Sequence, residues 1–91
     1  DTLVFKVLGK MYALCDIENF ESINLKCNPE VAIELRERFE SVKPGYHMNK
    51  KHWNTIVVNR DMDDAELYRW IDHSYDLVVS GLPKNKQAEL R

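Results

Sequence analysis

Hydrophobic positions in the first third of the chain fall in short runs rich in residues that favour β-strands. Two such runs, residues 3–8 and 11–15, are separated by Gly9-Lys10. Glycine at the first central position favours a type II′ hairpin turn, so these runs predict an antiparallel pair. In residues 22–27 the apolar side chains occupy every second position. This predicts a third strand with one buried and one wet face.

The period changes to that of an α-helix after residue 28. Asn28 followed by Pro29 is a typical helix start, because Asn caps first-turn N–H groups and proline has no N–H to leave unpaired. Val31, Leu35 and Phe39, with Ala32 beside them, then form an apolar stripe at helical spacing, and charged residues fill the outer face: Glu30, Glu34, Arg36, Glu37, Arg38 and Glu40. We interpret that charged face as a solvated helix surface.

The second half of the chain predicts a hairpin and another helix. Pro44-Gly45 interrupts the helical pattern, and residues 46–52 read as an extended arm that turns at residues 49–51 into a strand over 53–58. A helix then begins near Asp63, which has capping-box spacing to Glu66, and stops at Gly81. Its predicted buried face is formed by Leu67, Trp70, Ile71, Ser74, Leu77 and Val78.

The order β-β-β-α-β-α predicts an α+β fold, with an antiparallel sheet and helices packed on one face. A chain of 91 residues has the size of one domain. With 44% hydrophobic and 31% charged residues, the composition is that of a folded domain and argues against disorder, collagen-like repeats and coiled coil. We expect residues 1–84 to form a single domain and residues 85–91 a polar C-terminal tail.

Charge is distributed unevenly along the chain. Residues 41–60, which we call the basic segment, contain no Asp or Glu and carry Lys43, Lys50, Lys51 and Arg60. With +4 in this segment and −2 overall, the other 71 residues carry −6. Because charges are screened over about 8–10 Å at physiological salt, a ligand at this segment senses the local charge more than the total.

The sequence offers no catalytic or metal-binding constellation. It contains no GxGxxG, P-loop, HExxH or GxSxG motif, and His73, Ser74 and Asp76 share one helix and cannot converge as a triad. Cys15 and Cys27 lack zinc-site spacing, which favours reduced, buried thiols over a disulfide. We therefore expect no enzyme activity, cofactor or metal. Without a leader or a membrane-spanning run, we expect a cytoplasmic protein that does not bind membranes.

Nearly the whole chain, residues 3–84, resembles the MmcQ/YjbR family of small bacterial proteins. The matching stretches are FKVLGKMYAL, INLKCNPEVAIELRERF, KPGYHMNKKHWNTI and WIDHSYDLVVSGLPK, in that order. The resemblance implies a CyaY/frataxin-like fold and a "double wing" mode of DNA binding, in which β-hairpins approach the duplex. It also implies a leading helix that this chain lacks; the acidic ridge of frataxin belongs to that helix, so no iron site is carried over.

Carried over residue by residue, the resemblance implies these nucleic-acid-binding candidates: Lys43, Tyr46, His47, Asn49, Lys50, Lys51, His52, Trp53 and Asn54. The first hypothesis is therefore a DNA-binding module that contacts phosphates through a basic hairpin. If the four cations of the basic segment met phosphates, the log–log salt slope would be about −3.6, which is weak binding per monomer. Dimerisation or further lysines would raise the affinity.

The second hypothesis is a protein-interaction or small anionic-ligand-binding module, in which the polar groups of residues 47–54 line a pocket. The two hypotheses differ in shape: a concave site favours a small ligand, and cations spread over a convex ridge favour DNA. Carboxylates already paired with these lysines would remove the basis of the DNA hypothesis.

Overall fold

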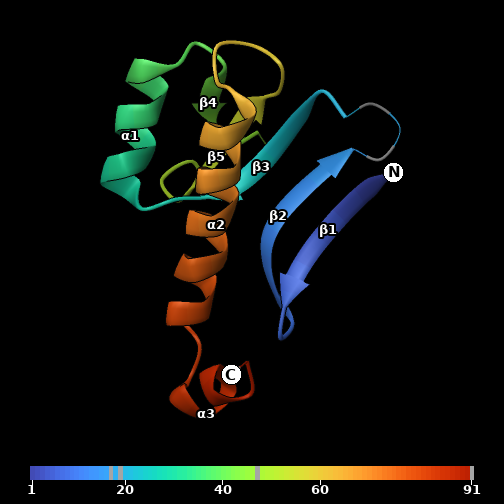
Figure 1. Cartoon of the computed structure of the whole chain (residues 1–91), viewed down its shortest axis with the longest axis vertical. Coiled ribbons are helices and arrows are strands. Elements are labelled where there is room, and N and C mark those ends of the chain that lie inside the picture. Colours follow the sequence, from blue (N-terminus) through green and yellow to red (C-terminus); the bar gives the residue numbers. More distant parts are fainter. Residues whose placement is uncertain (17, 19, 47, 91) are drawn as a thin grey trace.

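The computed structural model describes residues 1–16, 18, 20–46 and 48–90. Its elements are β1 (Thr2–Val7), β2 (Lys10–Asp16), β3 (Ser22–Lys26), α1 (Pro29–Arg38), β4 (Val42–Pro44), β5 (Trp53–Val57), α2 (Asp64–Ser80) and α3 (Lys84–Ala88). The strands form one antiparallel sheet in the order β1-β2-β3-β5-β4, and α1 and α2 lie beside each other across it (Figure 1). The predicted α+β architecture is confirmed.

The core lies between the sheet and the two long helices. Because side chains alternate across a strand, every second residue of the central strands faces the helices. The buried cluster consists of Ala13, Cys15, Ile23, Leu25, Cys27, Ala32, Leu35, Val42, Ile56, Met62 and Leu67. Trp70 and Ile71, from the predicted apolar face of α2, pack partly buried against it. The apolar residues of the strands and those of the two helices thus pack together in a single core.

The β1–β2 turn differs from the prediction by one residue. Val7 pairs with Lys10, so the central residues are Leu8 and Gly9 rather than Gly9 and Lys10. Their φ angles are +47° and +81°, and two positive φ values define a type I′ turn, not type II′. Type I′ suits the right-handed twist of the strands, but it places a leucine in the left-handed region.

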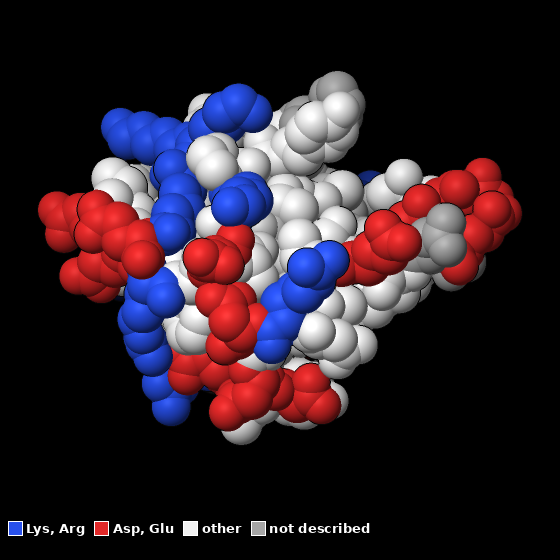
Figure 2. All heavy atoms as spheres, turned by 90° about the horizontal axis from the view of Figure 1, so that it is seen from above, with Lys and Arg blue, Asp and Glu red and all other residues white. Residues whose placement is uncertain are grey.

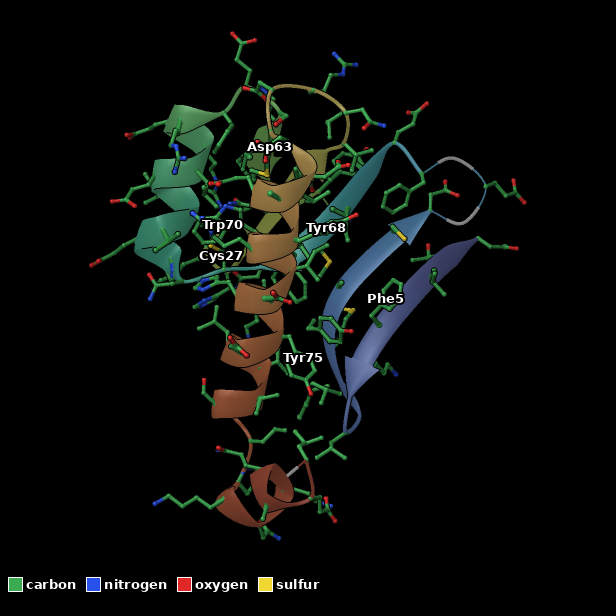
Figure 3. The ribbon with its side chains drawn as sticks, viewed as in Figure 1. Phe5, Cys27, Asp63, Tyr68, Trp70 and Tyr75 are labelled. Carbon is green, nitrogen blue, oxygen red and sulfur yellow. The ribbon has the colours of Figure 1, made fainter. Side chains whose placement is uncertain are left out.

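A β-bulge at Tyr12 connects β2 to α2. Phe5 pairs with Ala13 and Lys6 pairs with Met11, so Tyr12 is the extra residue of β2. The Tyr12 ring lies 6.3 Å from the Phe5 ring and edge-on to Tyr75 of α2 at 5.3 Å, measured between centroids. Figure 3 labels Phe5 and Tyr75 on these facing elements. The bulge therefore directs an aromatic side chain toward the helix layer.

Ser74 fastens α2 to the end of the β2–β3 ladder. Its hydroxyl donates to the Tyr12 carbonyl at 2.5 Å and accepts from the Lys26 backbone N–H at 2.9 Å. The residue is fully buried, as its place on the predicted apolar face of α2 indicates. A serine is tolerated there because both of its hydrogen-bonding roles are satisfied.

The helix ends follow the predicted caps. Asn28 accepts from the backbone N–H groups of Glu30 and Val31, Asp63 accepts from that of Glu66, and α2 ends at Gly81. Lys84–Ala88, at the start of the predicted polar tail, form the short helix α3, in which no described residue is buried. In the part of the chain that the structure describes, no helix is both long and apolar enough to span a bilayer.

Candidate nucleic-acid interface

The basic segment forms a hairpin at one edge of the sheet. β4 pairs antiparallel with β5, so that Lys43 lies opposite Thr55 and Pro44 opposite Asn54. Residues 45–52 connect the two strands. Beyond the end of β4, the Tyr46 N–H donates to the Thr55 hydroxyl at 2.9 Å, which holds the start of this connection against β5.

The connection is a folded loop rather than the predicted extended arm. The N–H groups of His52 and Trp53 both donate to the Asn49 carbonyl, at 3.3 and 3.0 Å, and the Met48 N–H donates to Gly45 at 3.3 Å. A Cβ on Gly45 would lie 2.7 Å from the Trp53 Cβ, which is closer than such atoms approach. Glycine is therefore required where the loop crosses back over β5.

An arginine from α1 anchors this loop. Arg36 Nε donates to Asn54 Oδ1 at 2.7 Å, and one terminal nitrogen donates to the carbonyls of Trp53, at 3.4 Å, and Lys50. The Asn54 amide in turn donates to the Ala32 carbonyl at 3.3 Å. Sequence reasoning missed Arg36, which the helical pattern assigned to a solvated face. The clue in the sequence was that Arg36 directly follows Leu35, a residue of the predicted apolar stripe.

The structure separates the nine predicted contact residues by exposure. Trp53 is 8% and Asn54 1% exposed, so their side chains belong to the core and its anchor. His52 is half-buried, its carbonyl accepts the Cys27 N–H at 2.7 Å, and His47 lies outside the described residues. The exposed members are Lys43, Tyr46, Asn49, Lys50 and Lys51. Of the nine, these five can meet a ligand at the surface.

Contact ion pairs do not neutralise the cations of the basic segment. Among the described residues, Arg38 and Arg69 both pair with Glu66, at 3.3 and 3.5 Å, and the third ion pair lies within α3. The cations that take part in none of these pairs include Lys43, Lys50, Lys51 and Arg60. The Lys50 ammonium instead donates to the Gly45 carbonyl at 3.1 Å.

Figure 2 looks down on the molecule from the top of Figure 1, the end at which β4 lies. Blue side chains lie mainly toward the left of that view, from top to bottom, and also near its centre. Red side chains lie at the left edge, through the centre and lower part, and on the projection at the right. Basic and acidic side chains are thus interspersed on this face, with the basic ones concentrated toward one side.

A hollow of about 720 Å³ adjoins the hairpin. It is lined by Glu40, Ser41, Lys43, Val57, Arg60 and Asp61, and so combines two cations with two carboxylates. The Asp61 carboxylate accepts the N–H groups of Glu40 at 2.6 Å and Ser41 at 3.0 Å. The buried Ser41 hydroxyl makes no hydrogen bond of ordinary geometry, yet it lies near enough to lower the Asp61 pKa, as do the two N–H groups. The Asp61 carboxylate thus holds the backbone of Glu40 and Ser41 in place and also contributes negative charge to the hollow.

Both cysteines are buried away from the candidate interface's surface. Cys15 and Cys27 are free and buried. Burial raises the pKa of both thiols, that of Cys27 to about 11 despite the opposing charge of Arg36. A thiol with a raised pKa is a poor nucleophile at neutral pH. Within the described part of the chain, no three His, Cys, Asp or Glu side chains gather as metal ligands would.

The family model named YjbR matches residues 1–77. The chain belongs to the YjbR family. Among relatives, "Uncharacterized protein YbdF" of Escherichia coli O157:H7 is 39% identical over 97% of this chain and 73% of its own length. "Uncharacterized protein YjbR" of Escherichia coli K12 is 35% identical over 93% and 73%.

A solved structure supports the same fold. The crystal structure of Deinococcus radiodurans protein DR2400, described with the family-model domain DUF419, superposes with a TM-score of 0.89 at 43% identity. The superposition covers 98% of this chain and 70% of the other. The family resemblance inferred from the sequence is therefore confirmed.

Proposed function

We propose that this YjbR-family domain is a binding module rather than an enzyme, and that it binds the phosphate backbone of duplex DNA through the β4–β5 hairpin in the double-wing mode. We place it in the cytoplasm, where its buried thiols stay reduced. The supporting observation is the exposed set of Lys43, Lys51 and Arg60, which form no ion pair within the described residues. Tyr46, 70% exposed beside them, offers a ring for stacking on sugar or base.

The geometry lowers the expected number of phosphate contacts. The Lys50 ammonium already donates one hydrogen bond to the Gly45 carbonyl within the loop, so we count Lys43, Lys51 and Arg60 as the phosphate contacts. Three phosphate contacts give a log–log salt slope of about −2.7. The acidic remainder of the chain disfavours any docking in which the helices approach the duplex.

The experiment is a titration of a labelled 20-base-pair duplex at low and moderate salt. We expect binding that weakens with salt, and a marked loss of affinity in the double variant Lys43→Glu/Lys51→Glu. The matched control is Lys84→Glu/Lys86→Glu, which changes the net charge equally on α3, at the end of α2 away from β4 (Figure 1). Absence of binding at low salt, indifference to salt, or an equal loss in both variants contradicts the proposal.

A second candidate function is the binding of a small anionic ligand or a protein segment. The hollow beside the hairpin supports it, because Lys43 and Arg60 both line a concave site of about 720 Å³. Its volume falls within the usual range of ligand sites, about 300–1,000 Å³. If inorganic phosphate shifts the amide resonances of β4 while duplex DNA fails to bind, this function replaces the first.

A further inference from the structure

The hollow beside the β4–β5 hairpin lies on the face of the sheet that points away from α1 and α2. Val42 and Ile56 pair with each other and belong to the core between the sheet and the helices. Because side chains alternate across a strand, the adjoining Lys43 and Val57, which both line the hollow, point to the opposite face. All the lining residues fall within residues 40–61, so one continuous stretch of chain builds the hollow.

The four charged side chains of the hollow balance one another without pairing. Lys43 and Arg60 contribute two positive charges, and Glu40 and Asp61 contribute two negative ones. All four residues are exposed, and no ion pair among the described residues includes any of them. A purely anionic ligand would satisfy the two cations but would meet the two carboxylates as like charges. A ligand that carries both signs would satisfy all four.

The wall of the hollow holds one carboxylate in a fixed position. The two oxygens of Asp61 accept the N–H groups of Glu40 and Ser41, which leaves further lone pairs for a ligand. The Ser41 hydroxyl lies near enough to lower the pKa of Asp61, so this carboxylate stays ionised at neutral pH. Ser41 is only 4% exposed, yet its hydroxyl makes no hydrogen bond of ordinary geometry. Buried polar groups rarely lack a partner, so this one marks an unsatisfied position in the wall.

We propose that the hollow binds a small zwitterion in which a short carbon chain joins a carboxylate to an ammonium group. Lys43 and Arg60 contact the carboxylate. Glu40 and Asp61 contact the ammonium, and half-buried Val57 offers apolar surface to the carbon chain. The inference rests on the second candidate function, a ligand in this hollow, and narrows that ligand from an anion to a molecule that carries both charges.

The experiment is an NMR titration of the isotope-labelled chain at pH 7 and constant ionic strength. The probes are glycine, β-alanine, γ-aminobutyrate and δ-aminovalerate, which place the two charges progressively farther apart. Propionate and propylammonium are the controls with a single charge. We expect one amino acid to shift the amide resonances of Lys43, Val57 and Arg60. Its dissociation constant should lie about fivefold below that of either control, because it gains a second ionic contact.

The variant Glu40→Gln separates a zwitterion site from an anion site. The Glu40 side chain is exposed, and its backbone N–H, which donates to Asp61, is retained. We expect the best amino acid to bind about fivefold more weakly, while propionate binds as well or better because a like charge is removed. Lys43→Met should weaken the binding of both. The matched control is Glu37→Gln, the same change at an exposed position of α1 outside the hollow, which should alter neither.

Three results overturn the inference. No amino acid of the series binds more tightly than propionate, Glu40→Gln weakens propionate and the amino acid equally, or Glu37→Gln lowers the affinity as much as Glu40→Gln does. In the first case, inorganic phosphate separates this failure from that of the second candidate function. If phosphate shifts the same resonances, the hollow binds anions alone. If no probe shifts them, the second candidate function fails as well.

Discussion

At the scale of single residues, Leu8 carries an evident conformational cost. Its φ of +47° lies in the left-handed region, which costs an L-residue about 1–2 kcal/mol. Its side chain is 43% exposed, so little burial is lost on replacement. We expect Leu8→Asn to raise the free energy of unfolding by about 0.5–1 kcal/mol, because asparagine tolerates this region and suits a type I′ turn. Urea unfolding measures the change.

The neighbouring glycine supplies the control. Gly9 has a φ of +81°, and no atom lies within 4 Å of where its Cβ would be. Gly9→Ala should therefore lower the free energy of unfolding by about 1 kcal/mol through backbone conformation alone. If Leu8→Asn and Gly9→Ala shift stability in the same direction, the turn is not type I′. Asn59, also at positive φ, shows that the chain accepts asparagine in this conformation.

At the scale of elements, α1 and the β4–β5 loop are held together by Arg36. The guanidinium binds Asn54, Trp53 and the Lys50 carbonyl, and no carboxylate pairs with it in the described chain. We expect Arg36→Met to lower the free energy of unfolding by about 2–3 kcal/mol. The variant loses charge-assisted hydrogen bonds and leaves the Oδ1 of buried Asn54 without its Arg36 donor. It should also speed amide exchange in residues 49–53, measured by NMR.

Arg38→Met is the matched control for this prediction. Arg38 lies on the same helix, and its side chain is 60% exposed in its pair with Glu66. Exposed pairs contribute about 0–1 kcal/mol, so this variant should unfold almost as the unaltered protein does. Equal losses in the two variants would mean that the anchor adds nothing beyond an ordinary surface ion pair.

The elements that follow from local chemistry were predictable from the sequence. Strand alternation, the Asn28 and Asp63 caps and the end of α2 at Gly81 each depend on a few neighbouring residues. The first turn was misplaced by one residue because glycine suits the first position of a type II′ turn as well as the second of type I′. The short helix α3 in the polar tail was not predicted, because its sequence carries no apolar stripe at helical spacing.

The site was harder to predict than the fold, because burial of its polar residues depends on tertiary contacts. Asn54 and Trp53 belong to the same polar, aromatic stretch as Lys51, and the resemblance counts all three among the contact candidates. Only the approach of α1, with Arg36 reaching over β5, turns Asn54 into a buried acceptor. The run of cations was visible in the sequence as a segment without Asp or Glu, whereas the presence of Glu40 and Asp61 in the same hollow as Lys43 and Arg60 required the structure.

At the scale of the whole molecule, the exposed cations of the β4–β5 hairpin belong to a chain whose other residues are net acidic. Within the described chain, the ion-paired helix arginines Arg38 and Arg69 share one carboxylate, and Arg36 turns inward. Most helix carboxylates in the described chain therefore face solvent without a pairing cation, while Lys43, Lys51 and Arg60 form no ion pair.

The contact between α2 and the β3–α1 junction makes stability depend on pH. His73 Nε2 accepts the Asn28 N–H at 3.3 Å, and the imidazole lies edge-on to Trp70 at 5.2 Å between centroids. Burial lowers the pKa of His73 from its ordinary value near 6.5, with Asp76 opposing the shift, so the folded state favours the neutral ring. The resulting stabilisation is complete above about pH 6.5 and is lost as pH falls through the lower folded pKa.

We therefore expect the urea midpoint, followed by tryptophan fluorescence, to fall between pH 7 and pH 5. Replacement by a side chain that cannot be protonated, His73→Gln, should remove most of that fall because glutamine can still accept the Asn28 N–H. The Asp61 pKa is also lowered, by Ser41 first and by backbone N–H groups, but that carboxylate loses its contribution only below about pH 4. The pH ranges over which His73 and Asp61 change the stability are thus separate. If the urea midpoint of His73→Gln falls as much between pH 7 and pH 5 as that of the unaltered protein, another group causes the fall. Protonation of His73 would then have no effect on the junction contact.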